Sequence, residues 1–358
     1  MPSPTTSPSP SKWAMVNDIA SSAVVFVTTN THMHFDAACQ DSHISTGFVV
    51  DSERGIIMTN RHVMSTAPST HTAKFFNGEW VQLAPWYYDP LHDYAFFKYD
   101  PAALKTTPAE IELAPEKALR NTEFMVVGND NGEKFSSAVG YLDDIMRGPP
   151  EYNSNGLELI DVNTVYYTSL TMNSTGSSGA PVLDVSGKAL AIVGGGSSSS
   201  QHIMMLPLHQ AKKTLAILQR DEFPSRGTIQ TVFSRKESSE LERVGFPVAE
   251  VLALSGEFRK DKGLLQVESV MPRGPAFLKL MLGDVLAFAD GKPVPDFDVL
   301  TDILDACVGK DIALVIYRDN QQVEVSARVQ DLFKLNPTQL VKIGYGHPDT
   351  FSTTILHE

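Results

Sequence analysis

The sequence predicts an all-β domain built as a double β-barrel, followed by a small α+β domain. Short β-rich runs separated by Gly, Asn, Asp and Pro residues fill most of 19–207, a pattern typical of barrels and sandwiches. A helical apolar stripe follows at 208–223. Residues 228–331 then mix strand-like runs with one amphipathic helix, which indicates a separate module of ordinary domain size.

Residues 1–18 are rich in Ser, Thr and Pro, and we expect them to form a disordered N-terminal tail. The all-β domain, 19–207, opens with the β-branched run 22–29, and a polar SERG turn joins 45–51 to 55–63 as a hairpin. Nine more strand-like runs follow, at 73–77, 80–84, 94–99, 124–128, 136–142, 164–170, 181–185, 189–193 and 202–206. The domain is therefore expected to consist almost entirely of strands.

A linker helix is expected over 208–227. Its apolar residues recur at helical spacing and share one face: Leu208, Ala211, Leu215 and Leu218. The α+β domain, 228–331, is expected to contain two strands, a strand pair around a DG turn, a helix that ends at Gly309 and a final hairpin. Residues 332–358 show no clear core pattern and are expected to form a C-terminal tail that resembles the opening of a second unit of the same kind.

Composition excludes several classes of partner. The net charge of −13 repels phosphate backbones, so we expect no nucleic acid partner. No apolar run is long enough to cross a membrane, and the N-terminus lacks a secretory signal. The two cysteines, Cys39 and Cys307, fall in different predicted domains and have no ligand spacing. We therefore expect no disulfide, no metal, no cofactor and an intracellular compartment, nuclear or cytoplasmic.

One loop, GSSGAP at 176–181, has the composition of a nucleophile turn. Ser178 is the expected nucleophile, and the N–H groups of Gly176 and Ser178 are the expected oxyanion hole. His62 ends an apolar strand and is the expected base, while Asp93 precedes the next apolar strand and is the expected orienting acid. Each signal alone is weak, because glycine turns, packed histidines and turn aspartates are common. The order His, Asp, Ser along one all-β domain is much more specific.

Three stretches carry a family resemblance. STGFVVDSERGIIMTNRHV (45–63), DPLHDYAFFKYDP (89–101) and TGSSGAPVLDVSGKALAI (175–192) resemble the HtrA/DegP serine proteases, in particular their eukaryotic nuclear, fungal pro-apoptotic branch. The resemblance implies a chymotrypsin/trypsin-like fold over 19–207, a PDZ-like domain over 228–331 and the triad His62, Asp93 and Ser178. It further implies protein quality control in the nucleus and homo-oligomers, commonly trimers.

The sequence departs from the family pattern at three places. Ala180 stands where the family often has a second glycine, and STGF replaces GSGF at 45–48. The nuclear branch usually carries a duplicated protease–PDZ array, whereas this chain has one copy. No departure removes a triad residue.

A substrate pocket is expected beside the nucleophile. Met172 and Asn173 would form one wall, and Ile192, Gly194 and Gly195 of a nearby strand would form the other. Neither wall carries an acid, so a small or medium aliphatic residue is favoured at the cleaved bond over Lys or Arg. The glycine- and serine-rich run at 194–200 is either an activation loop or a plain loop tip, and the 143–156 loop is hypothesised to order the oxyanion site.

The PDZ-like domain is expected to bind an extended peptide end by adding it as a strand. The turn residues Gly227, Thr228 and Ile229 would offer N–H groups to the terminal carboxylate, and Arg226 would either assist or lie exposed in the linker. The helix at 297–307 would line this site or, for most of its apolar residues, pack in the core.

Two functions follow. The first is an ATP-independent serine endopeptidase that cleaves unfolded or exposed protein segments. The second is a catalytically weak or inactive binding or chaperone protein that keeps the barrel. An α/β-hydrolase esterase is excluded, because that fold places its serine before the acid and the histidine and follows it with a helix, whereas here a Pro and a strand follow Ser178.

Overall fold

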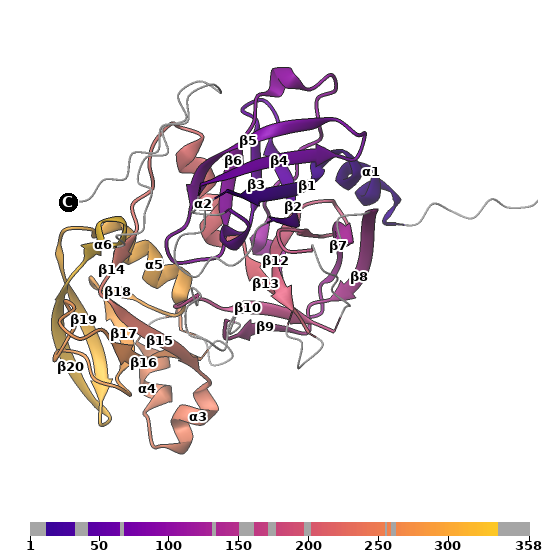
Figure 1. Ribbon diagram of the computed structural model, residues 1–358. Helices are drawn as coiled ribbons and strands as arrows, with labels where there is room; N and C mark the ends of the chain where they lie inside the picture. The colour runs from indigo at the N-terminus through magenta and orange to yellow at the C-terminus, as the bar shows by residue number, and fades with distance from the viewer. Residues whose placement is uncertain are drawn as a thin grey trace, which may run out of the picture. The chain divides into compact units, whose positions relative to one another are not determined.

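The computed structural model describes residues 12–32, 42–64, 68–130, 134–149, 161–170, 177–196, 202–254, 256–258 and 263–335. The chain divides into two compact units (Figure 1). Unit 1 comprises 1–89, 93–145 and 167–208, and unit 2 comprises 90–92, 146–166 and 209–358. No helix in the described part of the chain is both long and apolar enough to cross a membrane.

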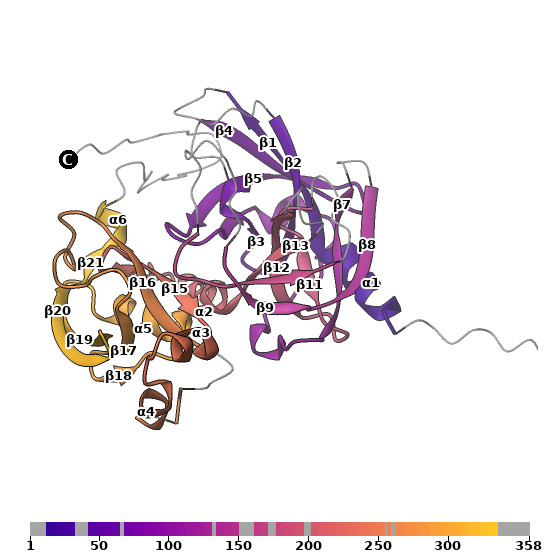
Figure 2. The ribbon, with the colours of Figure 1, turned by 90° about the horizontal axis from the view of Figure 1, so that it is seen from below.

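The first β-structure of unit 1 is a closed six-stranded barrel, several of whose strands are labelled in Figure 2. Its strands are β1 (Val24–Thr31), β2 (Ser42–Asp51), β3 (Ile56–Thr59), β4 (Ser69–Phe75), β5 (Trp80–Tyr88) and β6 (Ala95–Lys98), in the order β1-β2-β3-β6-β5-β4. Alternate residues of β1, such as Val25 and Val27, point into a core that also holds Ile57 and Phe97, as the period of two in a strand requires.

A seven-stranded sheet forms the second half of unit 1. Its strands are β7 (Glu123–Asp130), β8 (Lys134–Tyr141), β9 (Asp144–Arg147), β10 (Tyr166–Ser169), β11 (Pro181–Leu183), β12 (Ala189–Gly196) and β13 (Ile203–Pro207), in the order β8-β7-β11-β12-β13-β10-β9. Short 3-10 turns lie between the strands, at η1 (Arg61–Val63), η2 (Pro101–Ala103) and η3 (Pro115–Lys117). The predicted β-rich architecture of this part of the chain is confirmed.

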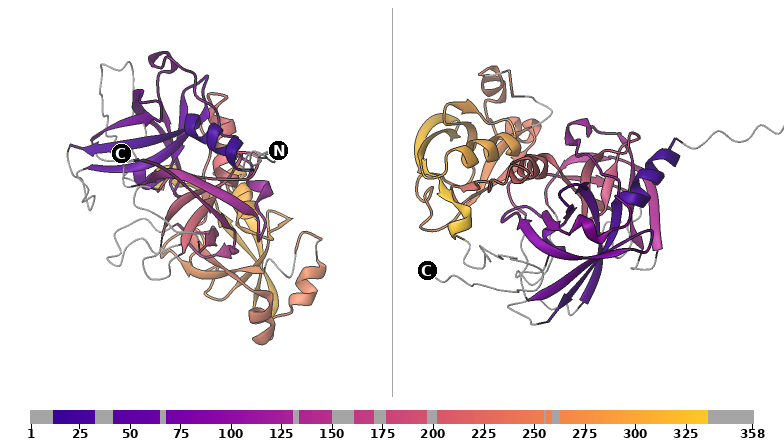
Figure 3. Two further views of the ribbon diagram at one scale, coloured as in Figure 1. Left: turned by 90° about the vertical axis from the view of Figure 1, so that its right-hand side faces the viewer. Right: turned by 90° about the horizontal axis from the view of Figure 1, so that it is seen from above.

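The expectation of a disordered tail up to residue 18 is wrong for its last part. Helix α1 (Ala14–Ala23) occupies it and leads directly into β1 (Figure 3). Trp13, Val16, Ala20 and Ala23 are buried. Their spacing of three and four residues is that of one helix face, so the signal is present in the sequence beside the Ser/Thr/Pro run.

Unit 2 is an α+β unit. Its helices are α2 (His209–Leu218), α3 (Ser238–Arg243), α4 (Val248–Ala253), α5 (Phe297–Ala306) and α6 (Leu332–Leu335). Its strands are β14 (Gly227–Thr228), β15 (Thr231–Lys236), β16 (Leu264–Val270), β17 (Val285–Ala289), β18 (Lys292–Pro293), β19 (Asp311–Arg318), β20 (Gln321–Arg328) and β21 (Gln330–Asp331). The main sheet runs β15-β16-β17-β19-β20, β18 pairs with β17, and β14 pairs with β21.

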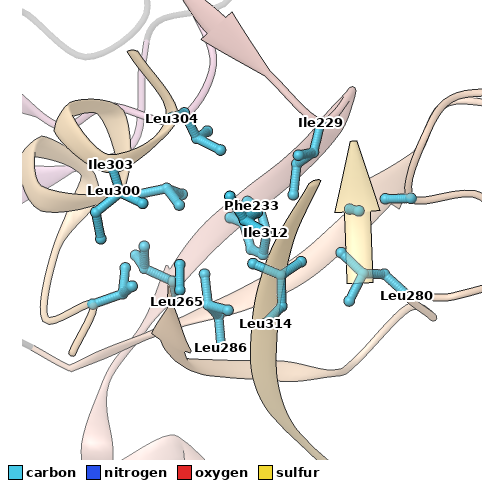
Figure 4. Packing of buried hydrophobic residues seen from close by; sticks show 14 of the residues in the cluster. Ile229, Phe233, Leu265, Leu280, Leu286, Leu300, Ile303, Leu304, Ile312 and Leu314 are labelled. Atoms are coloured by element: carbon cyan, nitrogen blue, oxygen red, sulfur yellow. The ribbon is translucent and has the colours of Figure 1, made fainter. Parts of the chain in front are cut away.

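Helix α5 supplies much of the core of unit 2. Leu300, Ile303 and Leu304 project from it toward the strand residues Phe233 and Ile312 (Figure 4). Its side-chain cap is Asp296, which accepts a hydrogen bond from the N–H of Val299 at 3.0 Å, as an N-cap residue should. The apolar residues of this helix therefore serve mainly as core.

Candidate active site

A histidine–aspartate pair lies at the end of strand β3. His62 sits in the η1 turn, and its Nδ1 is 2.7 Å from Oδ2 of Asp93. The other carboxylate oxygen of Asp93 accepts the backbone N–H of His62 at 3.0 Å. The side chain of Asp93 is 4% exposed and that of His62 is 43% exposed. The imidazole is thus oriented by a buried acid while its far edge remains accessible.

Asp93 is held in its ionised form. Burial opposes ionisation, but the charge of His62, its ring and backbone hydrogen bonds and the nearby Arg61 guanidinium outweigh burial and lower the pKa of Asp93 below its usual value. An ionised acid accepts from Nδ1–H and leaves Nε2 unprotonated in the neutral ring. That tautomer is the one a general base needs.

Residues around Asp93 fix its loop. Asn60 donates from Nδ2 to the carbonyl of Asp93 at 2.9 Å, and Arg61 donates from Nη1 to the carbonyl of Asp89 at 3.1 Å. The buried carboxylate of Asp89 accepts from the hydroxyls of Tyr87 at 3.0 Å and Tyr94 at 2.8 Å. Sequence reasoning missed this support, although Tyr-Tyr-Asp at 87–89 and Tyr94 bracket the predicted acid.

The turn that carries Ser178 is docked on the barrel. The carbonyl of Ser178 accepts the N–H of Thr46 on β2 at 2.8 Å. Thr59, at the end of β3 and three residues before His62, donates its hydroxyl to the carbonyl of Thr46 at 2.8 Å. The N–H of Gly179 reaches the carbonyl of Val193 on β12 at 2.9 Å. These bonds join the predicted nucleophile turn to the strand that leads to the predicted base.

Only glycine fits at position 179 of this turn. Its φ is +86°, and a Cβ there would lie 1.9 Å from the carbonyl oxygen of Thr46 and 2.5 Å from Oγ1 of Thr59. Any side chain would therefore push the turn away from the barrel.

The two sequence departures near the nucleophile have structural counterparts. Ala180 is fully buried, and the residue opposite it is Gly128, where an added Cβ would come within 3.0 Å of the Ala180 Cβ. Ala180 has a methyl group where the family often has glycine, and the absence of a side chain at Gly128 leaves room for it. In the STGF stretch, Oγ1 of buried Thr46 accepts the N–H of Asn129 at 3.1 Å, which ties β2 to β7.

Part of the predicted pocket is described. Ile192 and Gly194 are buried on β12, and Gly195 is half-buried on the same strand. Gly176, Met172 and Asn173 lie outside the described residues, as do 197–200 of the predicted activation loop and 150–156 of the other long loop. Among the residues that are described, no group of His, Cys, Asp or Glu side chains is arranged to hold a metal ion.

The turn expected to receive a peptide carboxylate, 227–229, makes contacts with other residues of unit 2. The N–H of Gly227 donates to Oδ1 of Asp305 at 2.7 Å, and Ile229 is buried in the core. Thr228 accepts the N–H of Gln230 on its hydroxyl at 2.9 Å. Arg226 is neither exposed nor a free anion ligand, because its buried side chain donates from Nη1 to Asp305 at 2.8 Å. Arg226 and Gly227 thus fasten the start of β14 to Asp305 of α5.

The fold is that of the trypsin-like peptidases, followed by an α+β unit. Residues 45–192 match the family model described as "Trypsin-like peptidase domain". The solved structure titled "HtrA-type protease AlgW with tripeptide" covers 90% of this chain and 97% of its own, with a TM-score of 0.64 and 22% identity.

Curated relatives are also similar to this chain. The chain is 38% identical over 308 residues to "Pro-apoptotic serine protease NMA111" of Yarrowia lipolytica. The aligned residues make up 85% of this chain and 31% of the relative. It is also 39% identical over 333 residues to "Protease Do-like 7" of Arabidopsis thaliana. Here the aligned residues make up 90% of this chain and 30% of the relative. The chain therefore spans about a third of the length of these relatives. The resemblance to HtrA-type serine proteases expected from the sequence is confirmed.

Proposed function

We propose that the chain is an ATP-independent serine endopeptidase of the HtrA type, with Ser178 as nucleophile, His62 as general base and Asp93 as orienting acid. The observation that carries this proposal is the buried, ionised Asp93 holding Nδ1 of His62 at 2.7 Å. The relatives are named serine proteases, and the nucleophile turn is hydrogen-bonded to the barrel strand pair that leads to His62.

The chemistry proposed is acyl transfer in two halves. Nε2 of His62 takes the proton of the Ser178 hydroxyl as Oγ attacks the peptide carbonyl, and the N–H groups of Gly176 and Ser178 stabilise the oxyanion. His62 then protonates the leaving amine, and an acyl-enzyme remains on Ser178. Water, deprotonated by the same imidazole, releases the acid product and restores the hydroxyl.

The substrates we propose are unfolded or exposed protein segments with a small or medium aliphatic residue before the cleaved bond. The described wall of the pocket, Ile192 and Gly194, carries no acid that would select Lys or Arg. Quality control in a reducing compartment, nuclear or cytoplasmic, agrees with the free thiol of Cys307. A homo-oligomer, by family resemblance a trimer, completes the proposal.

Unit 2 is proposed to bind an extended peptide as a PDZ-like domain. Its support is strand β15, which stands at one end of the main sheet in the described chain. An end strand presents backbone N–H and C=O groups to which a peptide adds as a further strand. The amide of Gly227 in the 227–229 turn already donates to Asp305.

The test of the catalytic proposal uses Ser178→Ala with Ser177→Ala as its matched neighbour. A fluorophosphonate probe should label the wild-type chain and Ser177→Ala but not Ser178→Ala, because the probe reacts only with an activated serine hydroxyl. Casein cleavage should fall by about three orders of magnitude or more in Ser178→Ala alone. Near-zero cleavage and no labelling in all three proteins would instead support the binding or chaperone role.

A further inference from the structure

Strand β15 has a backbone edge that is already occupied. One side of β15 pairs with β16, and the strand ends the sheet in the described residues. On the opposite side, the carbonyl of Thr231 accepts a hydrogen bond from Nδ2 of Asn163 at 3.0 Å. The N–H of Phe233 donates to Oδ1 of the same asparagine at 2.7 Å. Both bonds lie within unit 2, which includes 146–166.

These two bonds reproduce what an added strand would make. Thr231 and Phe233 are two residues apart, so their backbone groups face the same side of β15. A neighbouring strand satisfies such a pair with one donor and one acceptor. The primary amide of Asn163 carries one of each at the right separation, and it therefore takes the place of a strand residue at this edge.

The segment around Asn163 is shaped for this contact. Asn163 has a φ of +55°, a left-handed conformation that asparagine tolerates better than most residues. Two residues later, Val165 packs against the apolar cluster of unit 2 that includes Phe233 and Leu300. A polar and an apolar contact thus hold 163–165 on β15, as backbone bonds and side-chain contacts hold a bound peptide.

We propose that residues 163–165 are a built-in occupant of the β15 edge, which an incoming extended peptide with apolar side chains must displace. This inference rests on the proposed peptide-binding function of unit 2. It describes how that binding is regulated. Displacement would exchange the Asn163 amide for peptide backbone and Val165 for a peptide side chain. The apparent affinity of a peptide is then reduced by the fraction of molecules in which the edge is occupied.

The first experiment tests the occupant in the full chain without any ligand. Amide hydrogen exchange at Phe233 should be about tenfold faster in Asn163→Ala than in wild type, because the bond that protects this amide is lost. Asn320→Ala is the matched control. Asn320 is also a left-handed asparagine of unit 2, with a φ of +60°, and lies between β19 and β20. Unchanged exchange at Phe233 in Asn163→Ala would overturn the proposal.

The second experiment measures binding of a fluorescein-labelled decapeptide, Gly-Ser-Gly-Ser-Gly-Ser-Thr-Val-Val-Val with a free carboxylate. Asn163→Ala should bind it about tenfold more tightly than wild type or Asn320→Ala does. Val165→Thr, which keeps the side-chain shape, should also bind more tightly and serves if Asn163→Ala does not fold. Equal affinity in all proteins would overturn the occupant and leave peptide binding intact. Faster Phe233 exchange without any binding would uphold the occupant and refute the peptide-binding function.

Discussion

Asp93 uses its two carboxylate oxygens for different tasks. One oxygen holds the imidazole of His62 and the other holds the backbone N–H of the same residue. The ring and its turn are therefore fixed by a single side chain, whose burial strengthens both bonds.

A second histidine, His71, is buried for structural reasons. Its Nδ1 lies 3.0 Å from the hydroxyl of Thr29, and its ring packs on Phe97 with centroids 4.9 Å apart. Burial first, and then the charge of His43, lower the pKa of His71 from 6.5 to about 4. In the unfolded chain this ring takes a proton near pH 6.5. Between these values the unfolded state binds more protons, so acid destabilises the fold.

We expect His71→Gln to flatten this pH dependence. Relative to the variant, the wild type should lose about 3 kcal/mol of unfolding free energy between pH 6.5 and pH 4. Urea unfolding followed by tryptophan fluorescence measures it, because Trp13, Trp80 and Trp86 all belong to unit 1. His32→Gln, at an exposed site, should follow the wild-type curve. Parallel curves for wild type and His71→Gln would contradict the assignment.

For single residues, the sequence indicates which side chains can carry out the chemistry, but not whether a given backbone N–H group is free to bind a ligand. The order of His62, Asp93 and Ser178 in one β-rich domain suffices to nominate a triad. The expected peptide-binding role of Gly227 illustrates this, since its amide donates to Asp305, 78 residues later in the chain. Nothing local to a turn reveals such a partner, and the same holds for the support that Arg61 gives the Asp93 loop.

Among the elements, the 178–180 turn depends on its fit to three strands. It bonds to β2 through Thr46 and to β12 through Val193, while Ala180 faces Gly128 of β7. Ala180 and Gly128 are both small enough to pack against each other without a void or a clash, as a close-packed core requires.

We expect Gly128→Ala to destabilise unit 1 by about 1–3 kcal/mol, as overpacking does. The new Cβ would lie 3.0 Å from that of Ala180 and 3.3 Å from Oγ1 of Thr46. The double variant Gly128→Ala, Ala180→Gly should recover part of the loss, since the methyl group moves across the contact. Tryptophan fluorescence in urea measures all three variants. Additive effects of the two substitutions would show that the residues do not compete for the same space.

The elements most visible in the sequence are those with strong periodicity. Strands of the barrel and the apolar stripe of α5 follow period two and period 3.6, because each buries one face. Helices α3 and α4 were not expected: each has six residues, too few for a periodic signal. They form because Leu241 and Val251 pack with Phe246 and Tyr317, a tertiary cause.

For the whole molecule, the chain passes between the units more than once. Residues 146–166 group with unit 2, although they begin within β9 and end at the first residue of β10, two strands of the seven-stranded sheet. A division of the sequence into consecutive domains cannot foresee this, because the partners of Asn163 begin 68 residues later, at Thr231. The predicted domain over 19–207 includes this segment, whereas 146–166 groups with unit 2.

We therefore expect a fragment that ends at residue 208 to expose 161–166. Asn163 would lose both backbone partners and Val165 would lose its apolar cluster. Chymotrypsin should cleave after Tyr166, which is fully buried in the whole chain, at least about tenfold faster in the fragment, since local opening sets such rates. Tryptophan fluorescence would establish that the barrel of the fragment is folded. Equal cleavage of fragment and full chain would show that unit 2 does not protect this segment.

The place of Asn163 in the chain also bears on how the protein is made. This residue leaves the ribosome 70 residues ahead of Phe233, whose amide it accepts. At ordinary rates of synthesis the delay is roughly 3.5 to 14 seconds. During that interval Val165 lacks the cluster on which it packs in the folded chain, so the nascent chain exposes this apolar side chain until β15 has been synthesised.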